Sequence, residues 1–496
     1  MKKRDLAVRL IPAAVVCAVT GCRTTKEVLD DYEANVMSGN YSAPIPEVTE
    51  LAEKGDDSQQ LWRLLSGAAN YMADDKPAAL HQFDAAEEVF KKNDLTSVFA
   101  QTGDATLAML TNDRAFPYDG GGQDRVFTCL YKAVDFMSMG KFDAARVELN
   151  RSSQYQSNWL YDRRKDIDAA ARKLETDAAS YQTKQGVAGA TSAQNRSSQT
   201  SAVLSDADFA GKIRQQCGFD PATSGDLSRM AAADYMNAYA MHVTGVFRWL
   251  NGDSDRNELR DAMRLAGRNA VVAKDYAERD RNVRPDGCVW IWAEDGLCPV
   301  REEWRIDLPL ALLPYVNNYV IYAGMALPYL RARGPGAASW NVTGGGISEP
   351  MRELADVDAL VKSEYDVYMR GALTREITRT IVKVGVQAAL GAAAAAAEKR
   401  ARMKGEFPTA AMALRLSQIG VATWAASTTA ADLRSWTALP KSVKVARVPR
   451  PADGRLTVTA DGQRIELALP PGNAMVFIRK PSPAAPPVVK TAVFAR

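Results

Sequence analysis

The chain has 496 residues, of which 47% are hydrophobic, and it carries a formal net charge of +3. Chains of this length usually fold into about two or three domains with large buried cores. Residues 1–21 contain four basic residues and one acidic residue, so the rest of the chain is neutral by formal count. This balance excludes the basic excess that nucleic-acid binding requires.

The N-terminus contains, in order, the three parts of a bacterial lipoprotein signal. Basic residues between Lys2 and Arg9 precede an apolar run from Leu10 to Val19. About ten apolar residues are too few to cross a bilayer, which takes roughly 20, and they suit the core of a signal peptide. The next residues, Val-Thr-Gly-Cys, end at Cys22 and resemble the lipobox of bacterial lipoproteins. This resemblance implies that residues 1–21 are removed and that Cys22 is lipidated; an ordinary signal peptide with an incidental cysteine is the alternative.

The residue after Cys22 bears on localisation. In enterobacterial lipoproteins an Asp at this place commonly signals retention in the inner membrane, so Arg23 resembles an outer-membrane signal. Several acyl chains on one residue anchor a protein stably. We therefore expect a lipid-anchored protein of the cell envelope, in the outer membrane and facing the periplasm.

Four cysteines follow the lipobox, namely Cys129, Cys217, Cys288 and Cys298. An oxidising periplasm permits disulfides, but four cysteines allow three full pairings and the sequence does not choose among them. The two histidines, His81 and His242, have no metal-ligand spacing with these cysteines. We therefore predict no metal site and no cofactor.

Residues 22–281 are predicted to form a tetratricopeptide-like helical domain. Two stretches place a glycine, small residues and an aromatic residue where helices of such a repeat turn and cross: Gly140, Phe142, Ala145 and Leu149, and Gly67, Ala79, Phe83 and Ala86. Stacked hairpins of this kind offer a concave groove, so we expect residues 24–281 to fold alone and to hold a partner. An irregular helical bundle is the alternative.

Two interruptions occur in this helical half. Asp119-Gly-Gly-Gly122 resembles a phosphate loop only superficially, because it lacks the Gly-Lys-Ser/Thr ending, and it predicts a flexible turn before a helix at Val126. Residues 143–182 predict a long polar helix. Residues 184–205, rich in Gly, Ser, Ala, Thr and Gln, predict a mobile loop.

From residue 282 to residue 480 the pattern predicts an α+β module. Strand-type residues occur at 288–310 and again at 443–480. The pattern at 288–310 predicts two strands that pair with each other. We expect these strands to form one sheet, with inserted helices at 356–436 and a loose proline-rich tail at 481–496. The fold class is therefore α+β, mainly α.

An apolar segment, residues 384–397, lies within the predicted helices. Its fourteen residues are almost wholly Ala, Val, Leu and Gly, and charged residues flank it on both sides. It is too short to span a membrane. A helix that packs through its small residues against residues 422–431 is the preferred interpretation, and a pore-forming segment is the alternative.

Four stretches resemble a family of uncharacterised Gram-negative lipoproteins with a tetratricopeptide-like N-terminal half. They occur in the family's order and read LYKAVDFMSMGKFDAARVELNR, WAEDGLCPVREEWRIDLPL, LTREITRTIVKVGVQ and AADLRSWTALPKSVKVARV. The resemblance spans most of the chain after Cys22. It implies the architecture and the compartment, but no activity.

The sequence contains no recognisable catalytic constellation. It has no Gly-x-Ser-x-Gly motif, and His242 lies in an apolar helical context that predicts a packed side chain. The carboxylates of Glu294, Asp295, Glu302 and Glu303 are predicted to lie at a solvated hairpin end. The most motif-like residues are Arg434 and Trp436, for which we expect an Arg434–carboxylate pair and a Trp436 side chain packed under the sheet, with ligand binding as the alternative.

The function that these patterns favour is that of a non-enzymatic adaptor or scaffold in envelope biogenesis. Its partners would be a protein or peptide of the cell envelope and, through the N-terminal lipid, the membrane. A carbohydrate-binding or hydrolytic module on the C-terminal sheet is the alternative.

Overall fold

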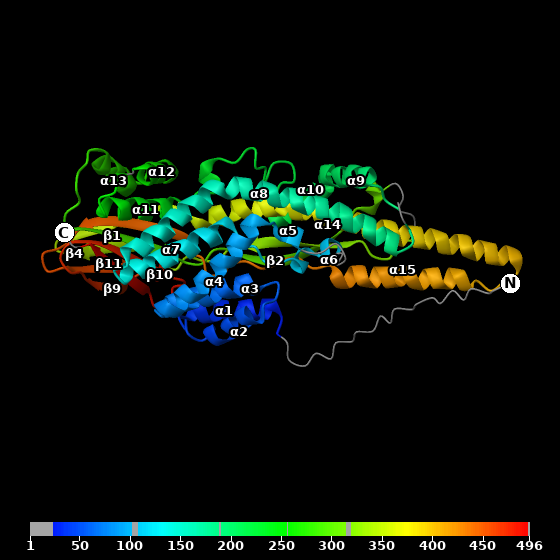
Figure 1. Cartoon of the computed structure of the whole chain (residues 1–496), viewed down its shortest axis with the longest axis horizontal. Helices are drawn as coiled ribbons and strands as arrows, with labels where there is room; N and C mark the ends of the chain where they lie inside the picture. Colours follow the sequence, from blue (N-terminus) through cyan, green and yellow to red (C-terminus); the bar gives the residue numbers. More distant parts are fainter. Residues whose placement is uncertain (1–22, 102–107, 188–189, 255, 314–318, 495–496) are drawn as a thin grey trace.

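The computed structural model describes residues 23–101, 108–187, 190–254, 256–313 and 319–494. The protein is 57% helical and 16% strand, with a helical array followed by sheets, which confirms the α+β, mainly α class. Figure 1 shows an elongated molecule in which most of the strands lie at one end and a helical hairpin projects from the other. The predicted signal peptide and Cys22 lie outside the described residues.

The first four helices form packed hairpins. They are α1 (Thr25–Ser38), α2 (Ile45–Lys54), α3 (Gln59–Met72) and α4 (Lys76–Leu95). A capping box between Thr24 and Glu27 starts α1, and the Asp75 side chain caps α4. A Cβ atom on Gly67 would lie 2.5 Å from the Phe83 ring, so only glycine lets α3 and α4 approach this closely. The small residue predicted at this crossing is confirmed.

The second part of the array is dominated by one long helix. Its elements are α5 (Val98–Gln101), α6 (Ala108–Thr111), α7 (Gly122–Ser138) and α8 (Phe142–Lys184). The turn between α7 and α8 places Gly140 at φ +71°, a left-handed conformation that favours glycine. The long helix predicted over residues 143–182 is confirmed by α8.

The mobile loop predicted at residues 184–205 is wrong over most of its length. Residues 193–205 form helix α9 (Ala193–Ser205), which α10 (Ala207–Cys217) follows. The segment is too polar to form a core alone, but it packs on a neighbour: Val203 is buried, and the hydroxyls of Thr200 and Thr378 lie 3.1 Å apart. Contacts with a distant helix thus supply the stability that its own composition lacks.

Three shorter helices complete the array, namely α11 (Ala238–Leu250), α12 (Asn257–Leu265) and α13 (Ala270–Asp280). Gly245 allows α11 and α12 to approach, because a Cβ atom there would lie 2.5 Å from Leu259 Cγ. His242 on α11 is fully buried, as its apolar context predicted.

The central sheet has five strands in the order β11-β10-β1-β7-β6. They are β1 (Cys288–Asp295), β6 (Arg352–Asp356), β7 (Ser442–Pro449), β10 (Asn473–Lys480) and β11 (Val488–Phe494). Strand β1 runs parallel to β10 and antiparallel to β7. The single sheet predicted for the strands at 288–310 and 443–480 is confirmed for β1, β7 and β10. It is wrong for the strands at 300–307, 455–460 and 463–468, which lie in other sheets.

The pairing predicted within residues 288–310 is wrong. Strand β2 (Val300–Asp307) pairs with β3 (Gly324–Arg331) in a separate two-stranded sheet. After β1 the chain does not fold back on itself, because Gly296 N donates to Lys480 O and Cys298 N donates to Leu439 O. These bonds to C-terminal segments take the place of a local hairpin.

A four-stranded sheet covers the other face of the central sheet. Its order is β5-β4-β8-β9, and its strands are β4 (Trp340–Gly344), β5 (Ile347–Pro350), β8 (Arg455–Ala460) and β9 (Gln463–Ala468). Val289 and Ile291 face this sheet, in one core with Val342 and Val458. Trp290 and Trp292 belong to the core on the helical side. Strand β1 is thus buried on both faces, which explains its nearly continuous hydrophobic sequence.

The prediction of a loose tail is wrong for residues 481–494: Ser482 and Ala485 are buried, and residues 488–494 form strand β11. Strand β11 pairs with β10 along the edge of the central sheet. Lys490 lies buried 2.6 Å from Asp135 of α7, and Phe494 lies against Phe142, with ring centroids 4.7 Å apart. The prolines occur only in the connection before β11.

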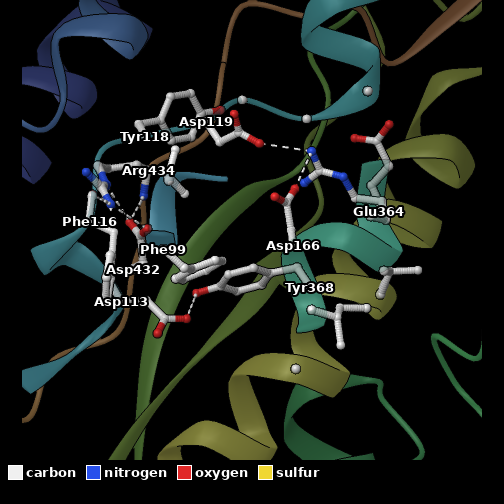
Figure 2. A pocket seen from close by; sticks show the side chains of 18 of the residues that line it. Phe99, Asp113, Phe116, Tyr118, Asp119, Asp166, Glu364, Tyr368, Asp432 and Arg434 are labelled. Carbon is white, nitrogen blue, oxygen red and sulfur yellow. Dashed lines mark hydrogen bonds and ion pairs between the residues drawn. The ribbon is translucent and has the colours of Figure 1, made fainter. Parts of the chain in front are cut away.

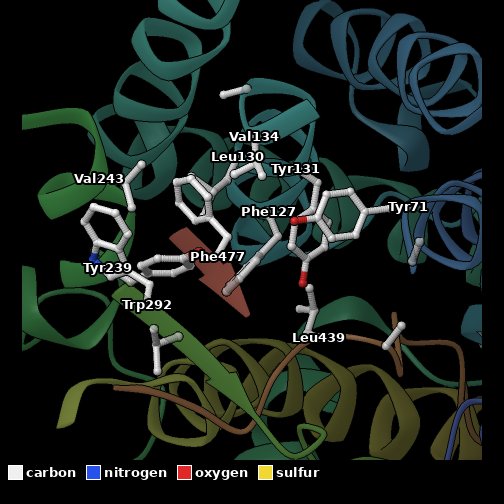
Figure 3. Close-up of a cluster of buried hydrophobic side chains, with 14 of the residues drawn as sticks. Tyr71, Phe127, Leu130, Tyr131, Val134, Tyr239, Val243, Trp292, Leu439 and Phe477 are labelled. Atoms are coloured by element: carbon white, nitrogen blue, oxygen red, sulfur yellow. The ribbon is translucent and has the colours of Figure 1, made fainter. Parts of the chain in front are cut away.

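The helical array and the central sheet share one core, which Figure 3 shows in close-up. Trp292 stacks on Phe477 with ring centroids 5.1 Å apart, and Tyr131 of α7 meets Trp436 edge to face at 6.0 Å. The sheet thus covers the inner face of the array. The predicted domain boundary at residue 281 marks a change from helices to strands. It does not divide the protein into two domains with separate cores.

The helices predicted at 356–436 are α14 (Val357–Lys404) and α15 (Thr409–Thr428), which form a hairpin. Residues 429–441 are not helical. Gly391 gives α14 room to pack, because a Cβ atom there would lie 2.7 Å from Gln418 Nε2 of α15. Among the described residues, only α14 is long and apolar enough to cross a membrane, and 61% of its most apolar stretch is buried inside the protein.

Candidate functional site

A cavity of about 160 Å³, partly open to solvent, lies between the array and α14 (Figure 2). Its walls come from residues 113–122, from α8 and α14, from β2, and from the segment before β7. Aromatic and charged side chains share the lining, which includes Phe99, Asp113, Tyr118, Asp119, Trp159, Arg163, Asp166, Arg301, Glu364, Tyr368, Arg375, Asp432 and Arg434.

The glycine-rich turn forms one wall and holds a carboxylate of the protein itself. Gln123 N, in the first turn of α7, donates to Glu364 Oε1 at 2.8 Å. A Cβ atom on Gly121 would overlap Glu364 Oε2, and one on Gly122 would overlap Trp159. The glycines are therefore needed for close approach. The three glycines gave the sequence its resemblance to a phosphate loop, and in the structure the group at this helix N-terminus is the carboxyl of Glu364.

Most of the charged side chains in the cavity are paired. Arg434 binds Asp432 at 2.8 Å, and Arg163 binds Asp119 at 2.9 Å. Burial alone would raise the pKa of Asp432, but the Arg434 guanidinium outweighs burial and lowers it. The pKa of Asp119 is lowered in the same way by the arginines around it. These carboxylates are ionised and held in place.

Glu364 differs from these carboxylates. Burial, with a further contribution from the charge of Asp124, raises the pKa of Glu364 to about 7. Asp124 accepts hydrogen bonds from Tyr118 Oη at 2.6 Å and from Gly121 N at 2.9 Å. Near neutral pH, Glu364 therefore exists both as a carboxylic acid, which donates a hydrogen bond, and as a carboxylate.

Among the described residues, Arg301 of β2 is the arginine of the wall that forms no ion pair, although its charge helps to lower the pKa of Asp432 and opposes the rise in the pKa of Glu364. Its guanidinium carbon lies 4.4 Å from the centre of the Tyr368 ring, and its Nη1 donates to Arg434 O at 3.3 Å. Within the described parts of the chain, no carboxylate forms an ion pair with Arg301, whereas Arg163, Arg375 and Arg434 each have one. Arg301 and Arg434 also border a second cavity of about 320 Å³, beside α1.

Of the two candidate binding residues from the sequence, Arg434 lines the cavity and Trp436 does not. The predicted pairing of Arg434 with a carboxylate is confirmed, and Arg434 also lines the cavity. Its Nη2 donates to Phe116 O at 2.9 Å, so it also fixes the loop that forms the wall. Trp436 does not line the cavity; it is 1% exposed and packs in the core against Phe83 and Tyr131.

The solvated position predicted for four carboxylates is wrong for two of them. Glu294 and Asp295 are buried, because β1 crosses the centre of the protein. Glu294 accepts hydrogen bonds from Tyr131 Oη at 3.0 Å and Tyr239 Oη at 2.9 Å. Glu302 and Glu303 lie on β2 in ion pairs with exposed arginines. None of the four lines the cavity.

His242 and the cysteines occupy structural positions, whereas His81 lies on the surface. His242 Nε2 lies 2.8 Å from Asp275, and its Nδ1 accepts a hydrogen bond from Trp292 Nε1 at 3.1 Å, while His81 is exposed. The four cysteines present in the described chain are free thiols. Burial raises the pKa of Cys217 to about 12 and that of Cys298 to about 11, so both are poor nucleophiles.

A cluster of three acidic residues, Asp84, Glu87 and Glu148, is the group in the described chain whose spacing suits a metal ion. The buried ammonium of Lys132 lies 2.7, 2.6 and 2.9 Å from their respective carboxylate oxygens. Lys132 therefore supplies the positive charge that these carboxylates need, and we assign the cluster a structural role.

No protein-family model, curated protein or solved structure matches this chain. Its function must therefore be inferred from its own residues. Among the residues that the structure describes, the cavity lining contains no serine, threonine, cysteine, histidine or lysine. Within the described chain, the lining combines one arginine that forms no ion pair, one carboxyl that donates or accepts, and aromatic walls.

Sequence reasoning missed Arg301, Glu364 and Tyr368. One signal was available, because Glu364, Tyr368, Gly371 and Arg375 recur every three or four residues and therefore share one face of α14. A mixed charged and aromatic stripe on a long helix indicates a polar cavity. Nothing local in the sequence brings Arg301 to that stripe, since β2 reaches it only through the tertiary fold.

Proposed function

We propose that this protein is a non-enzymatic, lipid-anchored adaptor of the cell envelope, and that its cavity recognises an anionic group of a partner protein. The group is the terminal carboxylate of a peptide chain, and it binds Arg301. The observation that carries this proposal is that Arg301 lies in the cavity wall without an ion pair in the described chain, whereas the other arginines of the wall are ion-paired.

The size of the cavity supports recognition of a group rather than of a whole metabolite. A volume of about 160 Å³ is close to that of a cavity that holds one benzene molecule, about 150 Å³. Tyr368 offers an aromatic surface beside Arg301, and Glu364 offers a hydrogen bond. Such a cavity suits one chain end of a larger partner.

The location of the binding site differs from the groove expected on the helical array. That inner face is covered by the central sheet, with Tyr131 and Phe83 packed on Trp436. The cavity beside α14 is the accessible alternative. The lipid anchor is supported by the lipobox that ends at Cys22, and it would hold the cavity beside the membrane.

The test uses peptides of defined chemistry. A library of envelope-protein C-terminal peptides is screened for binding to the purified protein, once with free carboxylates and once as C-terminal amides. We expect selected peptides to bind only with a free carboxylate. Arg301→Gln should weaken binding about 10- to 100-fold, because a hydrogen bond to a charged group contributes roughly 1.5–3 kcal/mol.

The matched control is Arg305→Gln, which removes the same charge from the same strand. Arg305 is exposed and paired with Glu303, so its replacement should leave peptide binding unchanged. Arg301→Lys should retain part of the affinity, since it keeps the charge but loses the planar fork. Equal binding by wild type and a folded Arg301→Gln variant would exclude the cavity as the recognition site.

The second candidate function is hydrolysis. Its site would be the cavity and not the C-terminal sheet, where the sequence analysis expected it. One observation favours it: Glu364, with a pKa near 7, shares the cavity with the ionised Asp119, and glycosidases combine carboxyls of these two kinds. Arg163 and Arg125 hold Asp119, which weakens it as a base. Release of reducing ends from purified envelope glycan, abolished by Glu364→Gln, would favour this function over the adaptor.

A further inference from the structure

The far half of the α14–α15 hairpin, residues 392–420, projects from the body of the molecule (Figure 1). Five of the thirteen large apolar side chains exposed among the described residues fall within residues 403–419. They are Met403, Phe407, Met412, Leu416 and Ile419, between 51% and 72% exposed. The exposed apolar surface is therefore concentrated on one projecting element, which marks an interaction site.

The exposed residues of α15 form a continuous stripe. Met412, Leu416 and Ile419 follow the i, i+4, i+7 spacing of one helix face. The opposite face, with Gln418 and Ala422, is buried against α14. Arg415 is the only charged residue in the twenty residues of α15. The outward face of α15 is therefore mainly apolar, and such a face suits an apolar partner better than it suits water.

The charge of the same hairpin indicates what that partner is. Residues 392–420 carry five basic residues, Lys399, Arg400, Arg402, Lys404 and Arg415, and two acidic residues, Glu398 and Glu406, for a net charge of +3. The chain after residue 21 is neutral by formal count, so its remaining part carries −3. Positive charge is thus segregated onto the apolar hairpin.

We propose that residues 392–420 insert into the interface of an anionic phospholipid membrane. Phe407, Leu416 and Ile419 lie among the acyl chains, and the basic residues bind the headgroup phosphates. Basic amphipathic helices bind membranes in this way, through apolar area and attraction to anionic lipid. The hairpin does not span the bilayer, because most of the apolar stretch of α14 is buried inside the protein.

A second copy of the chain is the less favourable occupant. Pairing two hairpins tip to tip would bring two net charges of +3 together, and like charges oppose such contact. An anionic membrane instead satisfies the apolar and the basic surface together. This membrane contact is independent of the cavity and adds to any lipid on Cys22.

The test measures flotation of the chain from Arg23 onward, which contains the whole described fold and no acylated cysteine. Vesicles contain phosphatidylcholine with 30% phosphatidylglycerol, or phosphatidylcholine alone. We expect flotation with the anionic vesicles and at least tenfold weaker binding to the neutral ones, since each basic residue near an anionic surface contributes roughly fivefold. High salt should weaken the binding further.

Two double variants locate the contact. Leu416→Glu with Ile419→Glu should abolish flotation. Leu95→Glu with Ile321→Glu, which alters apolar residues that are more exposed and lie outside the hairpin, should not. Arg301→Gln should float like wild type, so failure of the cavity proposal would be visible separately. Absence of flotation by wild type, or equal loss in both double variants, overturns the membrane contact. Suppose that the wild-type protein does not bind vesicles but forms dimers, and that Leu416→Glu with Ile419→Glu dissociates them. A second copy of the chain would then be the occupant, and the membrane contact would be overturned too.

Discussion

Trp436 offers the sharpest test of whether the helical array and the sheet fold as one unit. It lies in the segment before β7, is 1% exposed, and meets Phe83 of α4 and Tyr131 of α7, each with ring centroids 6.0 Å away. Its indole Nε1 has no hydrogen-bond partner in the described chain. Replacement by alanine therefore removes packing alone, at the junction of the two halves.

The magnitude follows from the buried area. A buried tryptophan removes about 150–250 Å² from water, which at about 25 cal/mol per Å² contributes roughly 4–6 kcal/mol. Measured Trp→Ala substitutions in cores cost about 3–5 kcal/mol. We therefore expect Trp436→Ala to lower the free energy of unfolding by about 4 kcal/mol. Trp436→Phe keeps an aromatic ring and loses no hydrogen bond, so it should cost less than half as much.

The assay is urea unfolding, followed by circular dichroism at 222 nm for the helices and by tryptophan fluorescence, to which Trp290 and Trp292 of β1 contribute. Both signals should change in one transition and shift together in Trp436→Ala. Tyr161→Ala, at a side chain that is 73% exposed, is the control and should stay within about 0.5 kcal/mol of wild type.

The reasoning would be refuted by two separate transitions of which Trp436→Ala shifts only one. The shared core also reverses the expectation for the fragment 24–281. Without the sheet, Tyr131 and Tyr239 would lose their buried contacts with Glu294, and Phe83 would be exposed. We expect that fragment to aggregate or to bind hydrophobic dye rather than to fold alone.

Three further outcomes are expected. Cys22→Ala should abolish labelling by radioactive palmitate, and equal labelling of both proteins would contradict lipidation. Burial raises the pKa of Asp135 to about 6 from its ordinary value of 3.8, despite the nearby Lys490. The folded state thus binds the proton more tightly, so stability should fall between about pH 4 and pH 6 and stay lower above, by at most about 3 kcal/mol. Urea midpoints measured against pH should show this fall, and Asp135→Asn should lack it. Deleting residues 488–496 removes β11 and the Lys490 partner of Asp135, and should cost about 3 kcal/mol or more; an unchanged urea midpoint would mean that the tail is dispensable.

The sequence alone determined the features that depend on neighbours along the chain. Gly67 beside the ring of Phe83 and the left-handed Gly140 could be predicted, because a helix crossing and a tight turn need small or flexible residues at fixed spacings. The long helix α8 followed from its composition and from the absence of any internal glycine or proline. The resemblance to envelope lipoproteins suggested a compartment, which stays a prediction.

The tertiary structure alone decided which distant segments meet. Strand-type residues along β1 indicated a strand, but they did not show that Val289 pairs with Ala474 and Val448 rather than with β2. Polar residues 193–205 became a helix because α14 supplied contacts for them. The cavity arose because Arg301 of β2 meets Tyr368 of α14. Hydrophobic periodicity specifies which face of an element is buried, whereas the identity of the segment that covers that face depends on the packing of the whole chain.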